Sequence, residues 1–117
     1  LFETGLQKEN EAPFKKRKLM NPAIRSLNVL KSDLVAAVTI NEITTSPKRI
    51  KEIIAAHTPV LESMEGAAFF YSCAQAQVPS IQLRAISNWV EPRNRDAWNI
   101  PLAIANLNQS VAQLLSE

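Results

Sequence analysis

The run LVAAVTI at residues 34–40 decides the predicted fold. Short apolar runs rich in β-branched residues are typical of strands that are covered on both faces. Residues 44–57 follow with a Thr-Thr-Ser-Pro start and isoleucines at helical spacing, which predicts a helix. Residues 59–64 are too few for a helix and predict an extended segment. A strand, a helix and a second extended segment in this order indicate a parallel β-α-β unit.

The alternation of helices and strands continues on both sides of this unit. Residues 65–76 predict a helix packed closely on a sheet, residues 80–87 predict a strand, and a last helix with one apolar stripe begins near Pro101. Upstream, an Asn-Pro pair predicts the start of another helix at residue 21, after an irregular segment over residues 1–20. We therefore expect an α/β core over residues 21–117, with three mainly parallel strands and an open sheet edge.

Composition excludes several classes of protein. The chain has 117 residues, 46% of them hydrophobic and 21% charged, with a formal net charge of +2. No apolar run approaches the roughly 20 residues that span a bilayer. A single cysteine and a single histidine exclude an internal disulfide and a typical structural zinc site, and two glycines exclude a phosphate-binding glycine-rich loop. We expect a cytoplasmic protein with no metal, no cofactor and no contact with a membrane.

The chain begins with Leu1 rather than Met, and no signal-peptide pattern follows it. Together with the thin predicted sheet, this start predicts a fragment of a longer domain.

Ligands of open α/β sheets bind beyond the carboxyl ends of the strands. Three positions qualify: residues 41–42, Met64 with Glu65, and Ser87 with Asn88. Taken singly, a glutamate at a helix start is most often a partner of the helix dipole, and an asparagine after a strand most often caps a loop. The amino-acid sequence of the surrounding segments favours a ligand-binding role over these structural interpretations.

The segments ESMEGAAF at residues 62–69 and RAISN at residues 84–88 resemble the paired signature of the nucleoside phosphorylase and nucleosidase superfamily. Residues 90–104, VEPRNRDAWNIPLAI, resemble one branch of it, the futalosine hydrolases of menaquinone biosynthesis. The resemblance covers residues 34–117 well and residues 1–31 loosely. It implies a three-layer α/β/α phosphorylase/hydrolase-like fold, with residues 1–117 as an incomplete C-terminal half of one nucleosidase domain. It also implies hydrolysis of the N-glycosidic bond of futalosine, a purine nucleoside, with release of hypoxanthine.

The resemblance assigns roles to the strand-end residues. Glu65 would accept hydrogen bonds from the 2′- and 3′-hydroxyls of the ribose, while Met64 packs on the sugar and Ser87 lies at the base. Asn88 stands where adenine-specific nucleosidases have an aspartate that protonates the purine N7. An amide is no general acid, but it can donate a hydrogen bond to N7 or O6 of a 6-oxopurine, which favours hypoxanthine as the leaving group.

Three further residues match places beside the base in the same family. Thr39 and Ile40 match the strand end that presents backbone groups and an apolar side chain to the base, although a buried strand end explains them as well. Trp89 would cover the base, although a tryptophan beside a strand is equally often part of the core.

Two arginines follow in the polar loop. Arg93 and Arg95 are candidates for the carboxylate that futalosine carries, because guanidinium binds carboxylates as a bidentate fork. We favour the alternative that this loop is held by ion pairs with Glu91 and Asp96.

Other conspicuous residues receive no functional role. The basic run at residues 15–18 predicts a solvated loop rather than a nucleic-acid contact. We expect His57 to interact with the dipole of the helix that it ends, and Cys73 to be a buried apolar residue.

The resemblance implies two protein partners: an absent N-terminal half that supplies the water-activating glutamate, and a second copy in a dimer. The alternatives are a purine nucleoside phosphorylase or a nucleosidase acting on methylthioadenosine and S-adenosylhomocysteine, and, from another class, a non-catalytic fragment or interaction module.

Overall fold

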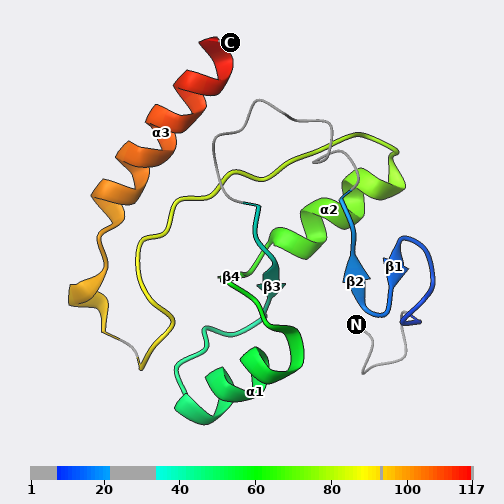
Figure 1. Cartoon of the computed structure of the whole chain (residues 1–117), viewed down its shortest axis with the longest axis horizontal. Helices are drawn as coiled ribbons and strands as arrows, with labels where there is room; N and C mark the ends of the chain where they lie inside the picture. Colours follow the sequence, from blue (N-terminus) through cyan, green and yellow to red (C-terminus); the bar gives the residue numbers. More distant parts are fainter. Residues whose placement is uncertain (1–7, 22–33, 93, 117) are drawn as a thin grey trace. The chain divides into compact units, whose positions relative to one another are not determined.

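The computed structural model describes residues 8–21, 34–92 and 94–116 (Figure 1). The chain divides into two compact units. The first contains Leu1–Asn28 and Glu65–Ile81, and the second contains Val29–Met64 and Gln82–Glu117.

A small hairpin opens the first unit. Strand β1 (Phe14–Lys15) pairs antiparallel with β2 (Lys18–Leu19). The loop residues Lys16 and Arg17 have φ values of 50° and 63°, the left-handed conformation that two-residue hairpin loops require. The Lys16 N–H donates to Asn10 Oδ1 at 2.8 Å, which holds the turn. The prediction of an irregular segment is therefore wrong for these residues, because the turn lacks the Asn-Gly or Asp-Gly pair that normally marks it.

Helix α2 (Gly66–Gln75) packs on β2, as the light green helix and blue hairpin of Figure 1 show. The buried Phe14 ring stacks on Tyr71 of α2, with ring centroids 5.6 Å apart and an interplanar angle of 23°. The helix ends before Val78, whose N–H donates to the Cys73 carbonyl at 2.9 Å. This aromatic contact forms the core of the first unit. The position of α2 confirms the predicted helix over residues 65–76.

Replacing Phe14 by Ala is expected to lower the free energy of unfolding by about 3 kcal/mol, because the change removes a buried ring and its stacking contact with Tyr71. Chemical denaturation followed by circular dichroism measures this loss. The matched control is Val78→Ala, since Val78 is exposed in the same unit, and it is expected to change stability by less than about 0.5 kcal/mol. Equal effects of the two changes would contradict the assignment of Phe14 to a core.

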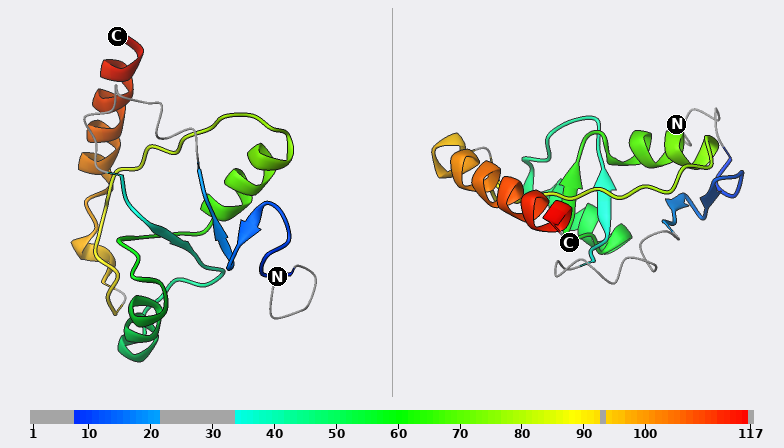
Figure 2. Two further views of the ribbon diagram at one scale, coloured as in Figure 1. Left: turned by 45° about the vertical axis from the view of Figure 1, so that its right-hand side comes forward. Right: turned by 90° about the horizontal axis from the view of Figure 1, so that it is seen from above.

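The second unit is built on a β-α-β unit. Strand β3 (Ala37–Thr39) and strand β4 (Leu61–Ser63) pair in parallel, with Val38 opposite Glu62, and α1 (Pro47–His57) connects them. Figure 2 shows the two strands side by side, in cyan and green. The predicted strand, helix and extended segment are confirmed here.

Helix α1 has signals at both ends that are visible in the sequence. The Ser46 side chain accepts a hydrogen bond from the Arg49 N–H at 3.5 Å, and Pro47 follows in the first turn, where its missing N–H costs nothing. Thr58 ends the helix in the left-handed conformation and donates its N–H to the Ile54 carbonyl. Ile53 is the residue that this helix buries.

The last part of the second unit is helical. A short 3-10 helix, η2 (Arg95–Ala97), precedes α3 (Ile100–Ser116). The Asn99 side chain accepts a hydrogen bond from the Leu102 N–H at 3.1 Å and so caps the N terminus of α3. The predicted last helix is confirmed.

The predicted strand over residues 80–87 is wrong: this segment belongs to neither sheet in the described part of the chain. Its alternating sequence suits a strand, but a strand also needs a neighbour for its backbone groups. The structure is mixed α/β with a small parallel sheet, and the described residues do not assemble the three layers that we expected. The helix predicted to follow Asn21 lies outside the described residues. Among the described helices, none has the length and apolar character needed to cross a membrane.

Candidate functional site

The carboxyl ends of β3 and β4 lie next to each other. Thr39 is paired with Ser63, and the Ile40 N–H donates to the Ser63 carbonyl at 2.9 Å. Thr39 and Ile40 are half-buried, whereas Met64, which follows β4 directly, is exposed. The structure thus brings together three of the residues predicted for the site: Thr39, Ile40 and Met64.

The loop after β3 returns to the side of β4. The buried Thr44 donates its N–H to Glu62 Oε1 at 3.3 Å, across the two strand ends. This contact fixes the Glu62 carboxylate on the loop side of the sheet.

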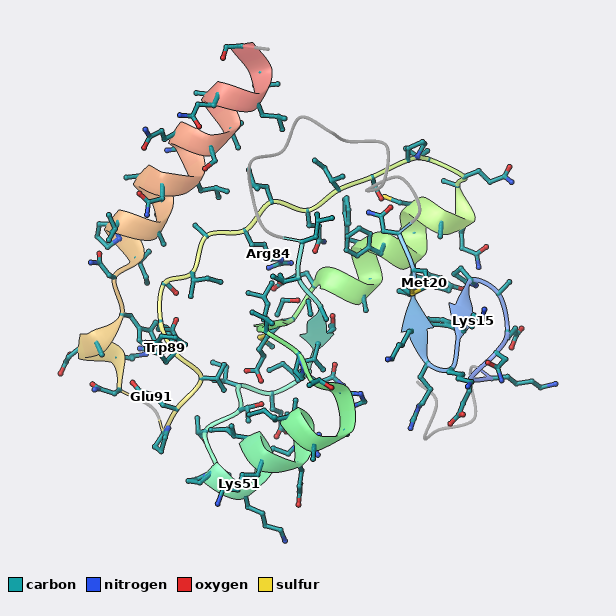
Figure 3. The ribbon with its side chains drawn as sticks, viewed as in Figure 1. Lys15, Met20, Lys51, Arg84, Trp89 and Glu91 are labelled. Carbon is teal, nitrogen blue, oxygen red and sulfur yellow. The ribbon has the colours of Figure 1, made fainter. Side chains whose placement is uncertain are left out.

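A small hollow in the surface, open to solvent, lies beside this contact, entirely within the second unit. Two tryptophans, two glutamates and one asparagine are among its lining residues. Its lining residues are Ile43, Thr44, Thr45, Glu62, Asn88, Trp89, Val90, Glu91 and Trp98. Figure 3 labels Trp89 and Glu91, which lie on the segment that leads into η2.

Local hydrogen bonds hold Asn88 in this wall. Its Oδ1 accepts from the Ser87 hydroxyl at 2.6 Å, and its Nδ2 donates to the Trp89 carbonyl at 2.8 Å. The Ser87 carbonyl in turn accepts from the Asn99 N–H at 2.8 Å, which ties the segment to the start of α3. An amide has two N–H hydrogens and two acceptor lone pairs, so Asn88 keeps one of each for a ligand.

Glu65 belongs to the first unit. It is the N-cap residue of α2, it is exposed, and its side chain makes no capping hydrogen bond. The residue lies at the positive end of the helix dipole, which favours a carboxylate there. It follows Met64 directly in the chain, at the end of β4.

The loop arginines differ in what the structure describes. Arg93 lies outside the described residues. The Arg95 guanidinium lies 5.9 Å from the centre of the Trp98 ring, and among the described residues it is ion-paired with neither Glu91 nor Asp96. For Arg95, the favoured prediction of a loop held by ion pairs is wrong, because a planar guanidinium also stacks well on an aromatic face.

The residues that we set aside have structural places. The basic run forms the hairpin turn, His57 is the basic residue in the last turn of α1, and Cys73 is half-buried in α2 rather than fully buried. Where the structure describes the chain, it gathers no three His, Cys, Asp or Glu side chains that could hold a metal ion.

Sequence reasoning did not place seven of the nine residues that line the hollow: Ile43, Thr44, Thr45, Glu62, Val90, Glu91 and Trp98. The sequence gives no signal for Thr44 and Glu62, because these two residues meet only when the two strands pair. The hollow lies beside the carboxyl ends of parallel strands, which is where open α/β sheets bind their ligands.

Comparison with known proteins agrees with a small-molecule site, because two similar proteins are both named futalosine hydrolase. The chain is 45% identical over 53 residues to the futalosine hydrolase of Streptomyces coelicolor, a stretch that covers 45% of this chain and 23% of that protein. It is 40% identical over 57 residues to the futalosine hydrolase of Thermus thermophilus, covering 49% of this chain and 25% of that protein. The chain therefore matches about a quarter of the length of these curated relatives. No family model and no solved structure matches it.

Proposed function

We propose that this chain is the part of a nucleosidase that binds the base and the ribose of futalosine, whose N-glycosidic bond is hydrolysed to release hypoxanthine in menaquinone biosynthesis. The observation that carries the proposal is the place of Asn88 in a hollow walled by Trp89 and Trp98. The similarity to two proteins named futalosine hydrolase supports it.

The hollow has the chemistry to bind a 6-oxopurine. Indole faces stack on planar rings, and the remaining N–H of the Asn88 amide can donate to N7 or O6, both of which are acceptors in hypoxanthine. Because Ser87 and Trp89 already orient the amide, little freedom is lost when the base binds.

The ribose is assigned to Met64 and Glu65. In the reaction the C1′–N9 bond breaks, its electron pair moves to the purine, and a bond forms between C1′ and the oxygen of water, whose protons end on hypoxanthine and the sugar. Positive charge develops on the sugar ring in the transition state. A carboxylate that accepts hydrogen bonds from the 2′- and 3′-hydroxyls stabilises that charge.

Arg95 is a candidate for the carboxylate of futalosine. Its guanidinium lies over Trp98, a residue of the hollow, and is not used in an ion pair with Glu91 or Asp96 where the structure describes them. A guanidinium at this edge can bind the substrate carboxylate as a bidentate fork. Arg93 has the same proposed role.

The test is a hybrid protein in which this chain replaces the C-terminal half of the Streptomyces coelicolor futalosine hydrolase, joined in one polypeptide. We expect the hybrid to release hypoxanthine from futalosine without added phosphate, measured by liquid chromatography. The N-terminal half alone is the control and is expected to be inactive. A folded hybrid that releases no hypoxanthine would overturn the proposal, and turnover that requires phosphate would assign the chain to the purine nucleoside phosphorylases instead.

A further inference from the structure

Asn99 is the residue at which helix α3 begins. Its side-chain Oδ1 accepts a hydrogen bond from the Leu102 N–H at 3.1 Å, and its carbonyl accepts the first helical bond, from the Ala103 N–H at 3.1 Å. Both bonds are typical of an N-cap residue, whose backbone is usually extended rather than helical. The N–H of such a residue lies outside the hydrogen bonds of the helix, so it can bind a neighbouring segment.

The Asn99 N–H holds a segment that is distant in the sequence. It donates to the Ser87 carbonyl at 2.8 Å, and this bond closes the loop of residues 88–98. Five of the nine residues that line the hollow belong to this loop, whereas Asn99 is not among the nine. The cap of α3 and the wall of the hollow are therefore linked by one hydrogen bond within the second unit.

Ser87 in turn fixes the orientation of the Asn88 amide. The Ser87 hydroxyl donates to Asn88 Oδ1 at 2.6 Å, while Asn88 Nδ2 donates to the Trp89 carbonyl at 2.8 Å. Because a carbonyl only accepts, the amide nitrogen has to face Trp89 and the amide oxygen has to face Ser87. This orientation matters for a 6-oxopurine. The second N–H of the amide can donate to N7 or O6, whereas an amide turned by half a rotation would bring its oxygen to the same two acceptors.

We propose that Asn99 is a positioning residue for Asn88. Its side chain caps α3, the capped backbone holds Ser87, and Ser87 holds the amide in the orientation that selects a 6-oxopurine. The effect on the reaction rests on the proposed function, because Asn99 acts on the base only through Asn88. The effect on the amide rests on the hydrogen bonds alone.

Helix α1 supplies a matched control, because it begins with a cap of the same kind outside the hollow. The Ser46 side chain accepts from the Arg49 N–H at 3.5 Å, and Ser46 does not line the hollow. Removing either cap is expected to lower the melting temperature to a similar extent. If Asn99 had the same purely structural role as Ser46, the two changes would also have the same effect on Asn88.

The first measurement is nuclear magnetic resonance relaxation of the Asn88 side-chain amide in this chain. In Asn99→Ala the order parameter of the amide is expected to fall to flexible values, below about 0.6. Asn99→Ser is expected to restore it, because serine caps helices about as well as asparagine, and Ser46→Ala is expected to leave it at the wild-type value. An amide that stays ordered in Asn99→Ala would overturn the proposal.

The variants are expected to fold, because Asn99 is exposed. Asn99→Gly is a second test of the same loss. Glycine costs a helix little at the N-cap, but it leaves the backbone at this position free, so the Asn88 amide is expected to lose its order as in Asn99→Ala.

The second measurement is hypoxanthine release from futalosine by the joined hybrid. Asn99→Ala is expected to lower kcat/KM about tenfold, because a misplaced amide no longer donates to the base in the right geometry. Asn99→Ser and Ser46→Ala are expected to keep wild-type activity, and equal losses with Asn99→Ala and Ser46→Ala would also overturn the proposal. If the hybrid releases no hypoxanthine while the amide loses its order in Asn99→Ala but not in Ser46→Ala, the proposed function fails and the positioning of Asn88 by Asn99 stands.

Discussion

Replacing Glu65 by Ala in the joined hybrid is expected to lower kcat/KM for hypoxanthine release from futalosine by at least about 100-fold. The side chain is exposed at the start of α2, so its loss is expected to leave the fold intact. In the proposed site, the change removes the acceptor for the two ribose hydroxyls and the negative charge that stabilises the transition state. The rate of hypoxanthine formation at several futalosine concentrations measures the effect.

Two further variants separate the causes of that loss. Glu65→Gln keeps a hydrogen-bond acceptor and removes the charge, so its activity is expected to lie between those of the wild type and Glu65→Ala. Glu52→Ala removes a carboxylate from the exposed face of α1, where it pairs with Lys48 and Arg49, and is expected to leave activity unchanged. Full activity of a folded Glu65→Ala protein would exclude Glu65 from ribose binding.

Short sequence signals correctly predicted those helices and strands whose stability depends on residues close together in the chain. The Ser-Pro start and isoleucine spacing of α1 and the continuous β-branched run that contains β3 are such signals, and both elements are found where they were expected. The hairpin was missed because Lys16 and Arg17 adopt a conformation that their side chains do not favour. There, hydrogen bonds from neighbouring residues, such as that of Asn10, outweigh intrinsic preference.

Residues 80–87 show the limit of pattern reasoning for strands. Alternation of apolar and polar residues states which face of a strand would be covered, but it does not supply the neighbouring strand. In the described residues this segment is in neither sheet, although Leu83 and Ala85 are half-buried and Arg84 and Ile86 are exposed, as the alternation predicts. The sequence therefore predicted the faces of this segment and not its pairing.

The wall of the hollow depends on contacts between segments far apart in the chain. Asn88 stood out because it follows an apparent strand, but nothing near Glu62 indicates that its carboxylate accepts from the Thr44 N–H. Likewise, Arg95 is about as near in sequence to the carboxylates of Glu91 and Asp96 as it is to Trp98. The sequence alone does not tell which of these residues its guanidinium contacts, whereas the structure shows the contact with Trp98.

The largest change in specificity is expected for Asn88→Asp. In the proposed site, the Asn88 amide donates a hydrogen bond to N7 or O6 of hypoxanthine, which are both acceptors, and an ionised carboxylate at the same place would repel both. The expected result in the joined hybrid is a decrease of about 10- to 100-fold in kcat/KM for futalosine, in line with the 1–3 kcal/mol cost of leaving buried polar groups unpaired. For an adenine nucleoside the direction is opposite, because a carboxyl group can carry a proton to N7 as the base leaves.

Futalosine and methylthioadenosine, assayed in parallel for released hypoxanthine and adenine, measure this shift as a ratio of two kcat/KM values. The ratio matters more than either value, since Asn88→Asp also replaces the hydrogen bond to the Trp89 carbonyl by a repulsive contact and so affects the positions of both substrates. Asn94→Asp is the matched control, because Asn94 is exposed in the same loop and makes no side-chain capping bond to η2. If both asparagine variants keep the wild-type ratio, Asn88 does not contact the base, and the selectivity for hypoxanthine must come from other residues.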